Sequence, residues 1–282
     1  MARQATMTVW DVQLGLAVHV KAPNGKYIII DLGTGTVESG NSSPLRKLMW
    51  NNIVYMIISH PHLDHISDIL NFDINPPKIL HCPKSLTNEE IMEGVRYCDR
   101  AKFEKYCEIN DRYNSPVGVD DENYTGNPNN YDGLEIQTFS TSACDHSNFN
   151  NFSIITVFTL SDVKVVVCGD NEKEALDILM RRSNFKDAVK NADVLVAPHH
   201  GRNSAYHSDF VSLVNPRITI ISDTEKSDAS ASDKYTNMSR GWEVKGEERK
   251  CLTTRKDGNI TVVFGECDDP RYTGTLRIST SK

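Results

Sequence analysis

The sequence predicts a layered α/β fold, and two observations carry that prediction. Short apolar runs of strand length alternate with helical segments along nearly the whole chain. Chemically reactive side chains directly follow several of these runs, which is where layered α/β proteins build their sites. With 282 residues the chain can bury a large core, so we predict one domain over residues 1–282.

The composition excludes several classes of protein. It is 39% hydrophobic and 24% charged, as in a globular protein. The first eleven residues lack the apolar stretch of a secretion signal, and no run approaches the length of a membrane span. The seven cysteines are scattered, which suits a reducing compartment. We therefore expect a cytoplasmic protein without a membrane partner, and the net charge of −7 argues against general polyanion binding.

The N-terminal region predicts a hairpin followed by a buried strand. Two strand-like runs, 6–11 and 15–21, precede Pro23-Asn24-Gly25-Lys26, whose Asn-Gly pair favours a hairpin turn. Residues 27–30 return as a strand that ends at Asp31, before Gly33. A carboxylate in this position either points into an active site or caps a turn, and the local sequence leaves both readings open.

A cluster of histidines follows the next buried strand. A short helix over 44–50, capped by Ser42 or Ser43, leads to the apolar run 53–58, and then comes Ser59-His60-Pro61-His62-Leu63-Asp64-His65. Imidazole and carboxylate are donors suited to zinc, manganese or iron, and a tight loop can bring them together. A His-rich surface loop is the alternative. The clustering favours a metal site, with a helix beginning at Asp64.

Residues 84–133 read as an insertion in this pattern. We predict a helix over 88–106 and then a long loop rich in Asn, Asp, Gly, Pro and Tyr. A loop of this length is usually a lid, a binding loop or disordered, and we expect it to border the active site. His81, just before it, stands alone and is expected to be structural or exposed.

The second half repeats the strand pattern and adds further candidate ligands. Strands are predicted over 134–141, 154–160, 163–168 and 192–197, with a helix over 172–182. His146 precedes the second of these strands, Asp170 follows the third, and His199 and His200 follow the fourth. Six of the nine histidines therefore lie where a layered fold gathers its site.

These motifs resemble the metallo-β-lactamase superfamily, and within it the hydrolase domain of the DNA-uptake protein ComEC and its free-standing relatives. Besides His-x-His-x-Asp-His, the likeness rests on Asp11-Val12-Gln13-Leu14-Gly15, Asn150-Asn151-Phe152-Ser153, Gly169-Asp170 and Pro198-His199-His200-Gly201 with Ser204. The resemblance implies a four-layer αββα sandwich. The chain departs from the family at Ile66-Ser67-Asp68, where small residues are usual, and no channel helices accompany it.

The resemblance also implies a ligand set for two ions. His60, His62 and His146 would hold the first ion, Asp64, His65 and the last histidine the second, and Asp170 would bridge them. We take His200 as that last histidine and place His199 near the scissile phosphate as a proton donor, although their roles could be exchanged. Asp64, Asp170 and His199 are the expected catalytic residues, supported from behind by Asp31, Asn151 and Ser204.

Charge points to the substrate class. Two divalent ions, zinc or manganese, would contribute four positive charges, and two carboxylates and a bridging hydroxide would contribute three negative ones. The resulting net charge of +1 suits a phosphodiester. We therefore predict a metal-dependent phosphodiesterase or nuclease that cleaves DNA or RNA. The alternative is a hydrolase of a small phosphodiester, such as a cyclic nucleotide or a phosphorylcholine ester. A lactonase or β-lactamase is a weaker reading, as is a binding module without activity.

Two questions about partners stay open in the sequence. Lys245, Arg249, Lys250, Arg255 and Lys256 could form an edge that faces nucleic acid, or a solvated surface, because Glu247, Glu248 and Asp257 are interleaved with them. A homodimer and an operon-encoded partner are both compatible with the sequence.

Overall fold

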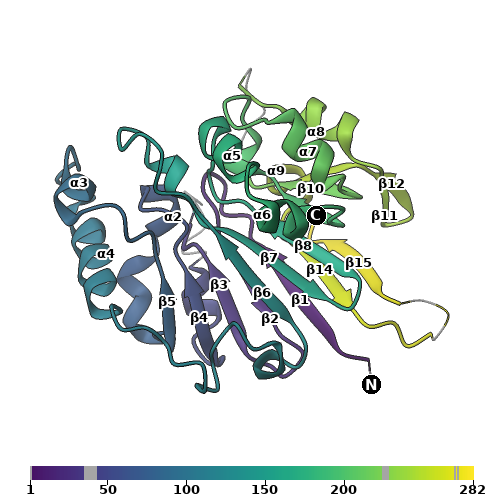
Figure 1. Cartoon of the computed structure of the whole chain (residues 1–282), viewed down its shortest axis with the longest axis horizontal. Helices are drawn as coiled ribbons and strands as arrows, with labels where there is room; N and C mark the ends of the chain where they lie inside the picture. Colours follow the sequence, from purple (N-terminus) through teal and green to yellow (C-terminus); the bar gives the residue numbers. More distant parts are fainter. Residues whose placement is uncertain (1, 35–42, 224–228, 270, 272) are drawn as a thin grey trace.

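The computed structural model describes residues 2–34, 43–223, 229–269, 271 and 273–282. Two sheets pack face to face, and helices cover the outer face of each (Figure 1). The predicted four-layer αββα sandwich is therefore confirmed.

The first sheet has seven strands and the second has six. In spatial order the first comprises β15 (Thr275–Thr280), β14 (Ile260–Gly265), β1 (Gln4–Val9), β2 (Val18–Lys21), β3 (Tyr27–Ile30), β4 (Ile53–Ile57) and β5 (Ile79–His81). The second comprises β13 (Cys251–Thr253), β10 (Ile218–Ile221), β9 (Val194–Val196), β8 (Val163–Val167), β7 (Ile155–Leu160) and β6 (Glu135–Phe139). A separate hairpin pairs β11 (Trp242–Val244) with β12 (Glu247–Arg249). Valine and isoleucine from both large sheets fill the space between them, which explains the apolar runs in the sequence.

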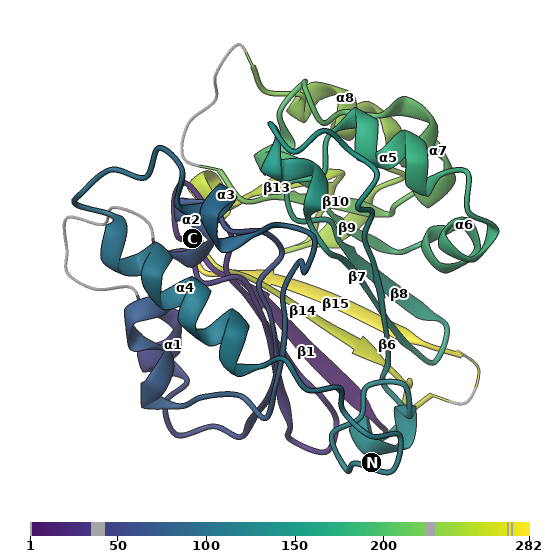
Figure 2. The same ribbon diagram turned by 60° about the vertical axis from the view of Figure 1, so that its left-hand side comes forward.

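Helices seal the two outer faces (Figure 2). The first sheet is covered by α1 (Pro44–Lys47), α2 (Leu63–Ile66), η1 (Ile69–Ile74), α3 (Asn88–Met92) and α4 (Arg100–Arg112). The second is covered by α5 (Lys173–Leu179), α6 (Ser183–Val189), α7 (Ser208–Val214) and α8 (Ser232–Met238). Short helices η2 (Pro128–Tyr131), η3 (Phe149–Phe152), η4 (Pro198–Gly201) and α9 (Thr254–Asp257) lie in the connections. Among the described helices, none has the length and apolarity that a membrane crossing requires.

The inserted segment differs from its prediction. The single helix expected over 88–106 is two helices, because Gly94 has a positive φ and residues 93–99 leave the helical path. Ile91 on α3 and Tyr106 on α4 are buried, whereas Cys98 between the two helices is exposed. The loop that follows lines a cavity of its own with Tyr55 and His81.

His19 on β2 gives the fold a pH-dependent stability. Its ring lies 5.3 Å from the Trp10 ring and 5.8 Å from that of Tyr27, and its Nδ1 is buried without a hydrogen bond among the described residues. Burial lowers the pKa of His19 to about 4, against 6.5 for an exposed histidine. Between about pH 6.5 and pH 4, His19 is protonated in the unfolded chain but stays neutral in the folded chain. The free energy of unfolding therefore falls as the pH is lowered through this range.

We expect this effect to cost about 2 kcal/mol in the free energy of unfolding at pH 5 relative to pH 7. The His19→Phe variant keeps an aromatic ring between Trp10 and Tyr27 but cannot titrate. Urea unfolding of both proteins at the two pH values measures the difference. An equal loss of stability in wild type and variant would show that His19 is not responsible.

Candidate metal centre

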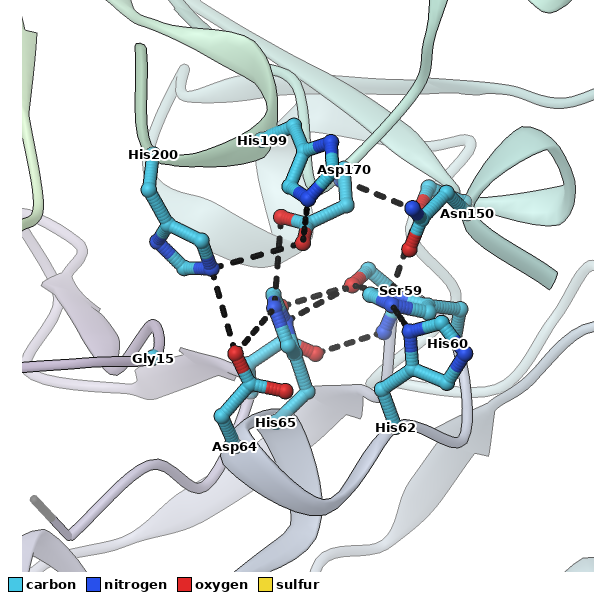
Figure 3. Close-up of polar contacts among 12 residues, drawn as sticks. Gly15, Ser59, His60, His62, Asp64, His65, Asn150, Asp170, His199 and His200 are labelled. Atoms are coloured by element: carbon cyan, nitrogen blue, oxygen red, sulfur yellow. Dashed lines mark hydrogen bonds and ion pairs between the residues drawn. The ribbon is translucent and has the colours of Figure 1, made fainter. Parts of the chain in front are cut away.

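The fold itself gathers the candidate ligands. β3, β4, β8, β9 and β10 all run parallel to a neighbour in their sheets. Asp31 follows β3, the histidine cluster follows β4, Asp170 follows β8, and the pair His199-His200 follows β9. Because carboxyl ends of parallel strands meet at one edge of a sheet, these side chains converge at the same edge of the sandwich (Figure 3).

Four side chains form the centre of this site. One ligand atom from each of Asp64, His65, Asp170 and His200 lies within 4.8 Å of the others. His65 Nε2 is 3.2 Å from an Asp170 oxygen and 4.0 Å from an Asp64 oxygen. His200 Nε2 is 3.3 Å from an oxygen of each carboxylate. The two imidazoles and two carboxylates thus face a common point from three segments of the chain, since Asp64 and His65 are adjacent.

Both imidazoles in this group are oriented by a hydrogen-bond acceptor at Nδ1. His65 Nδ1 lies 2.8 Å from Asp31 Oδ2, and His200 Nδ1 lies 2.9 Å from the Ser222 carbonyl oxygen. Each Nδ1 must carry a proton to donate to these acceptors, which leaves Nε2 directed at the carboxylates. Neither Nε2 makes a well-formed hydrogen bond with any described residue, although both are buried.

The electrostatics of the cluster are those of a closely packed set of opposite charges. Burial alone would raise the pKa of Asp170, but His200 and His65 outweigh it and hold that pKa well below its usual range. Burial would lower the pKa of His65, yet Asp170 and Asp31 hold it well above its usual range. Asp170 and Asp64 likewise raise the pKa of His200 to about 9 against the effect of burial.

This donor set fits a divalent cation. A cation at the common point would meet two carboxylate oxygens and two Nε2 lone pairs, and its positive charge would offset the two buried or half-buried carboxylates. Neutral imidazole with carboxylate is a set that zinc and manganese accept. The orphaned Nε2 atoms of His65 and His200 are the observation that supports this fit.

His60 and His62 lie beside the four-residue group and face each other. His60 Nε2 is 3.0 Å from His62 Nδ1, and the two rings are 4.5 Å apart. Hydroxyl oxygens of Ser59 and Ser153 lie 3.2 and 3.1 Å from His60 Nδ1. Burial lowers the pKa of His60 and His62, and the neighbouring His65 lowers it further. This favours the neutral imidazole, which is the form that binds a metal ion.

His199 lies next to the cluster and is oriented by a carboxylate. Its Nδ1 is 2.8 Å from Glu172 Oε1, while its Nε2 is 3.9 Å from Asp170 Oδ2. Ser204 Oγ approaches the same Nδ1 at 3.4 Å. Asn151 contributes from further back, because its side-chain oxygen accepts the backbone N–H of Glu172 at 3.1 Å. Burial lowers the pKa of His199.

The structure does not bring His146 to this group. Its side chain is 44% exposed, and its Nδ1 lies 2.7 Å from Glu90 Oε1 on α3. His146 and Glu90 instead line a cavity of about 540 Å³ with His62, Glu93 and Phe149. Of the seven predicted ligands, the structure therefore gathers four tightly and two beside them, while His146 lines the adjoining cavity and contacts Glu90.

Special backbone conformations hold the ligand loops. His199 and His200 have φ values of 47° and 52°, a left-handed conformation that costs about 1–3 kcal/mol per residue. Gly15, at φ 116°, passes so close to Asp64 that a Cβ there would lie 2.3 Å from the Asp64 carbonyl oxygen. The Gly15 carbonyl also accepts the Ser222 hydroxyl at 2.7 Å, which ties the loops of Asp64 and His200 together.

Comparisons with known proteins identify the family to which the fold belongs. The model of the metallo-β-lactamase superfamily matches residues 11–222. The competence protein ComA of Neisseria gonorrhoeae is 22% identical over 225 residues, which are 78% of this chain and 27% of ComA. The chain thus spans about a quarter of the length of this curated relative.

Two solved structures have a similar fold. The metallo-β-lactamase fold protein YhfI from Bacillus subtilis is 11% identical with a TM-score of 0.45, over 88% of this chain and 95% of YhfI. A long form RNase Z from yeast is 14% identical with a TM-score of 0.42, over 84% of this chain and 40% of that one. The sandwich, the histidine cluster and the family match over residues 11–222 together establish that the chain belongs to the metallo-β-lactamase superfamily.

Proposed function

We propose that the chain is a two-metal phosphodiesterase that cleaves nucleic acid. The observation that carries the proposal is the group formed by half-buried Asp64 with buried His65, Asp170 and His200, with the His60–His62 pair beside it. The first four residues would hold one divalent ion, and the histidine pair would bind the other together with Asp170. Zinc and manganese both suit this set.

Charge at the site favours an anionic diester. Two divalent ions contribute +4, and Asp64 and Asp170 contribute −2. The buried carboxylate of Asp31, in contact with His65, lowers the balance to +1 before any water is ionised. That centre still attracts a phosphodiester, which carries one negative charge. The resemblance to ComEC-like hydrolases is what favours nucleic acid among the phosphodiesters.

The protein side chains divide the chemistry between them. Divalent ions at such a centre polarise the phosphoryl oxygen and lower the pKa of water. Asp64 and Asp170 fix the ligand geometry, while Asp31 and the Ser222 carbonyl keep His65 and His200 in the required tautomer. His199, held by Glu172, is placed to give a proton to the leaving oxygen.

Replacing His199 by glutamine should lower kcat by about 10²-fold while leaving the bound metal unchanged. Glutamine can still hydrogen-bond but cannot deliver a proton, and His199 lies outside the four-residue group. Steady-state kinetics on an activated diester and metal analysis of the same preparation measure both quantities. Loss of an ion in His199→Gln would instead make His199 a ligand and reverse its role with His200.

A small phosphodiester is the second candidate, and one observation favours it. The cavity that His62 shares with His146 is lined by Glu90 and Glu93 and by no described lysine or arginine, while Arg96 is the one basic residue described in a second cavity lined by His62. Two of the basic C-terminal residues already form ion pairs within the protein. Arg249 pairs with Asp257 at 3.1 Å, and Arg255 pairs with Asp223 at 3.2 Å. These contacts reduce the basic surface that a long polyanion would use.

A substrate panel separates the two candidates. Metal-stripped protein resupplied with Mn²⁺ or Zn²⁺ would be tested on single-stranded DNA, duplex DNA, RNA, cyclic dinucleotides and a phosphorylcholine ester. Metal-dependent cleavage of a polymer supports the proposal. Cleavage of only a small diester selects the second candidate, and no cleavage of any phosphodiester by metal-loaded protein contradicts both.

A further inference from the structure

The ion proposed at His60 and His62 needs a third protein ligand. His146 does not face this position, because its side chain contacts Glu90 and Phe152 instead. Its Nδ1 faces Glu90, and its ring packs edge-on against Phe152 at 4.9 Å. Glu90 is itself fixed, since its carboxylate accepts the Thr87 N–H at 2.7 Å and its own N–H donates to Thr87 Oγ1 at 3.2 Å. This capping box at the start of α3 holds the carboxylate, and so His146, at the outer wall of the cavity.

Asn150 lies where a third ligand is needed. It belongs to η3, it is 9% exposed, and its side chain points toward His60 and His62 (Figure 3). The side chain comes within hydrogen-bonding reach of His62. Its Oδ1, however, is buried and makes no well-formed hydrogen bond with any described residue. Leaving a buried amide oxygen without a well-formed hydrogen bond is unfavourable.

The neighbours of Asn150 in η3 already have their roles. Asn151 binds α5 through the Glu172 N–H and the Glu174 carboxylate. Ser153 contacts His60 and accepts the Asp170 N–H at 3.0 Å. Phe152 is in the core under α4 and α5. Asn150 therefore stands out as the buried polar side chain of this helix whose oxygen has no such role.

We infer that Asn150, and not His146, completes the metal position formed with His60 and His62. This inference rests on the two-metal centre proposed above. An amide oxygen is a neutral, hard donor of the kind that manganese and calcium accept in proteins, and imidazole nitrogens supply the rest of the set. Binding of a cation would satisfy the orphaned oxygen without moving His146 away from Glu90.

The decisive experiment counts bound ions in three variants. Wild type, Asn150→Ala, Asn150→Asp and His146→Gln would be stripped, loaded with Mn²⁺, desalted and weighed intact by native mass spectrometry. Wild type and His146→Gln should each hold two ions, and Asn150→Ala should hold one. Asn150→Asp should hold two, with the weaker-bound ion at least tenfold tighter by calorimetry, because a carboxylate adds charge to the same oxygen position.

Several results would overturn the inference. Two ions in Asn150→Ala, or only one in His146→Gln, would return the ligand role to His146. If Asn150→Ala does not fold, unchanged Mn²⁺ affinity in Asn150→Asp would be enough to reject it. Fewer than two ions in wild type would reject the two-metal proposal as well, whereas two ions in wild type with the reverse variant pattern would reject only this inference.

Discussion

Asp170→Asn should reduce turnover of a phosphodiester by at least about 10³-fold. Asp170 is 3% exposed, and its two oxygens approach both His65 and His200. In the proposed two-metal centre Asp170 would be shared by both ions, and asparagine offers one neutral oxygen in its place. The amide also directs N–H groups at a site built for a cation, so the ions should bind far more weakly.

The measurement pairs kinetics with metal content by mass spectrometry. Asp177→Asn is the matched control, because Asp177 lies on α5 a few residues along the chain and pairs with His207 at 64% side-chain exposure. That variant should keep both ions and full activity. If the Asp170→Asn protein folds, holds two ions and has the wild-type turnover rate, then Asp170 is not the shared ligand.

The convergence of the candidate ligands could be predicted from the sequence because strand ends determine where they lie. Asp64, Asp170 and His200 follow apolar runs, and an apolar run is readable as a buried strand from composition alone. Once the strands are parallel neighbours, their carboxyl ends converge whatever the loop details are. The structure accordingly brings these residues together with His65.

The sequence could not predict which atoms meet inside the loops. His146 was included because it precedes a strand, but its ring direction is set by Glu90, which comes from an inserted helix 56 residues earlier. Ser59 and Ser153 belong to the quoted motifs but were given no role in the site, and neither was Glu172, although each contacts a site histidine. Glutamate at a helix start and serine beside a strand are too common to signal a role.

The break in the predicted helix over 88–106 has a related cause. Hydrophobic spacing continued past Glu93, but Gly94 adopts a positive φ and the chain turns. That turn places α3, with Glu90 and Glu93, beside His62 rather than along α4. A periodic pattern thus predicted helix correctly on both sides of the break and missed the feature that brings the insertion to the site.

Asp31→Asn is expected to lower metal affinity by about 10–100-fold and turnover by more. Asp31 is fully buried and accepts three hydrogen bonds, from Ser59 N, Ser59 Oγ and His65 Nδ1, at 2.6, 2.7 and 2.8 Å. Asparagine has the same shape and tolerates the φ of 60° at this position. Its oxygen can accept the Ser59 N–H in place of Oδ1, but its NH₂ group would then face both Ser59 Oγ and His65 Nδ1 in place of Oδ2.

That reversal should change the tautomer of His65. With a donor opposite it, Nδ1 becomes the acceptor, and the proton moves to Nε2, the atom that faces Asp170 and Asp64. A protonated Nε2 has no lone pair for a cation. The fold should persist, so the loss of affinity by calorimetry would occur without a matching loss of secondary structure, and ¹⁵N shifts of the His65 ring would report the tautomer directly.

Asp68→Asn separates this effect from the general cost of altering a buried carboxylate. Asp68 is 2% exposed and accepts hydrogen bonds from Ser43 Oγ and Leu45 N at 2.6 and 3.1 Å, at the start of α1. Its replacement should lower the unfolding free energy while leaving metal affinity near wild type. Equal losses of affinity in both variants would mean that packing, rather than the proton position on His65, connects Asp31 to the metal centre.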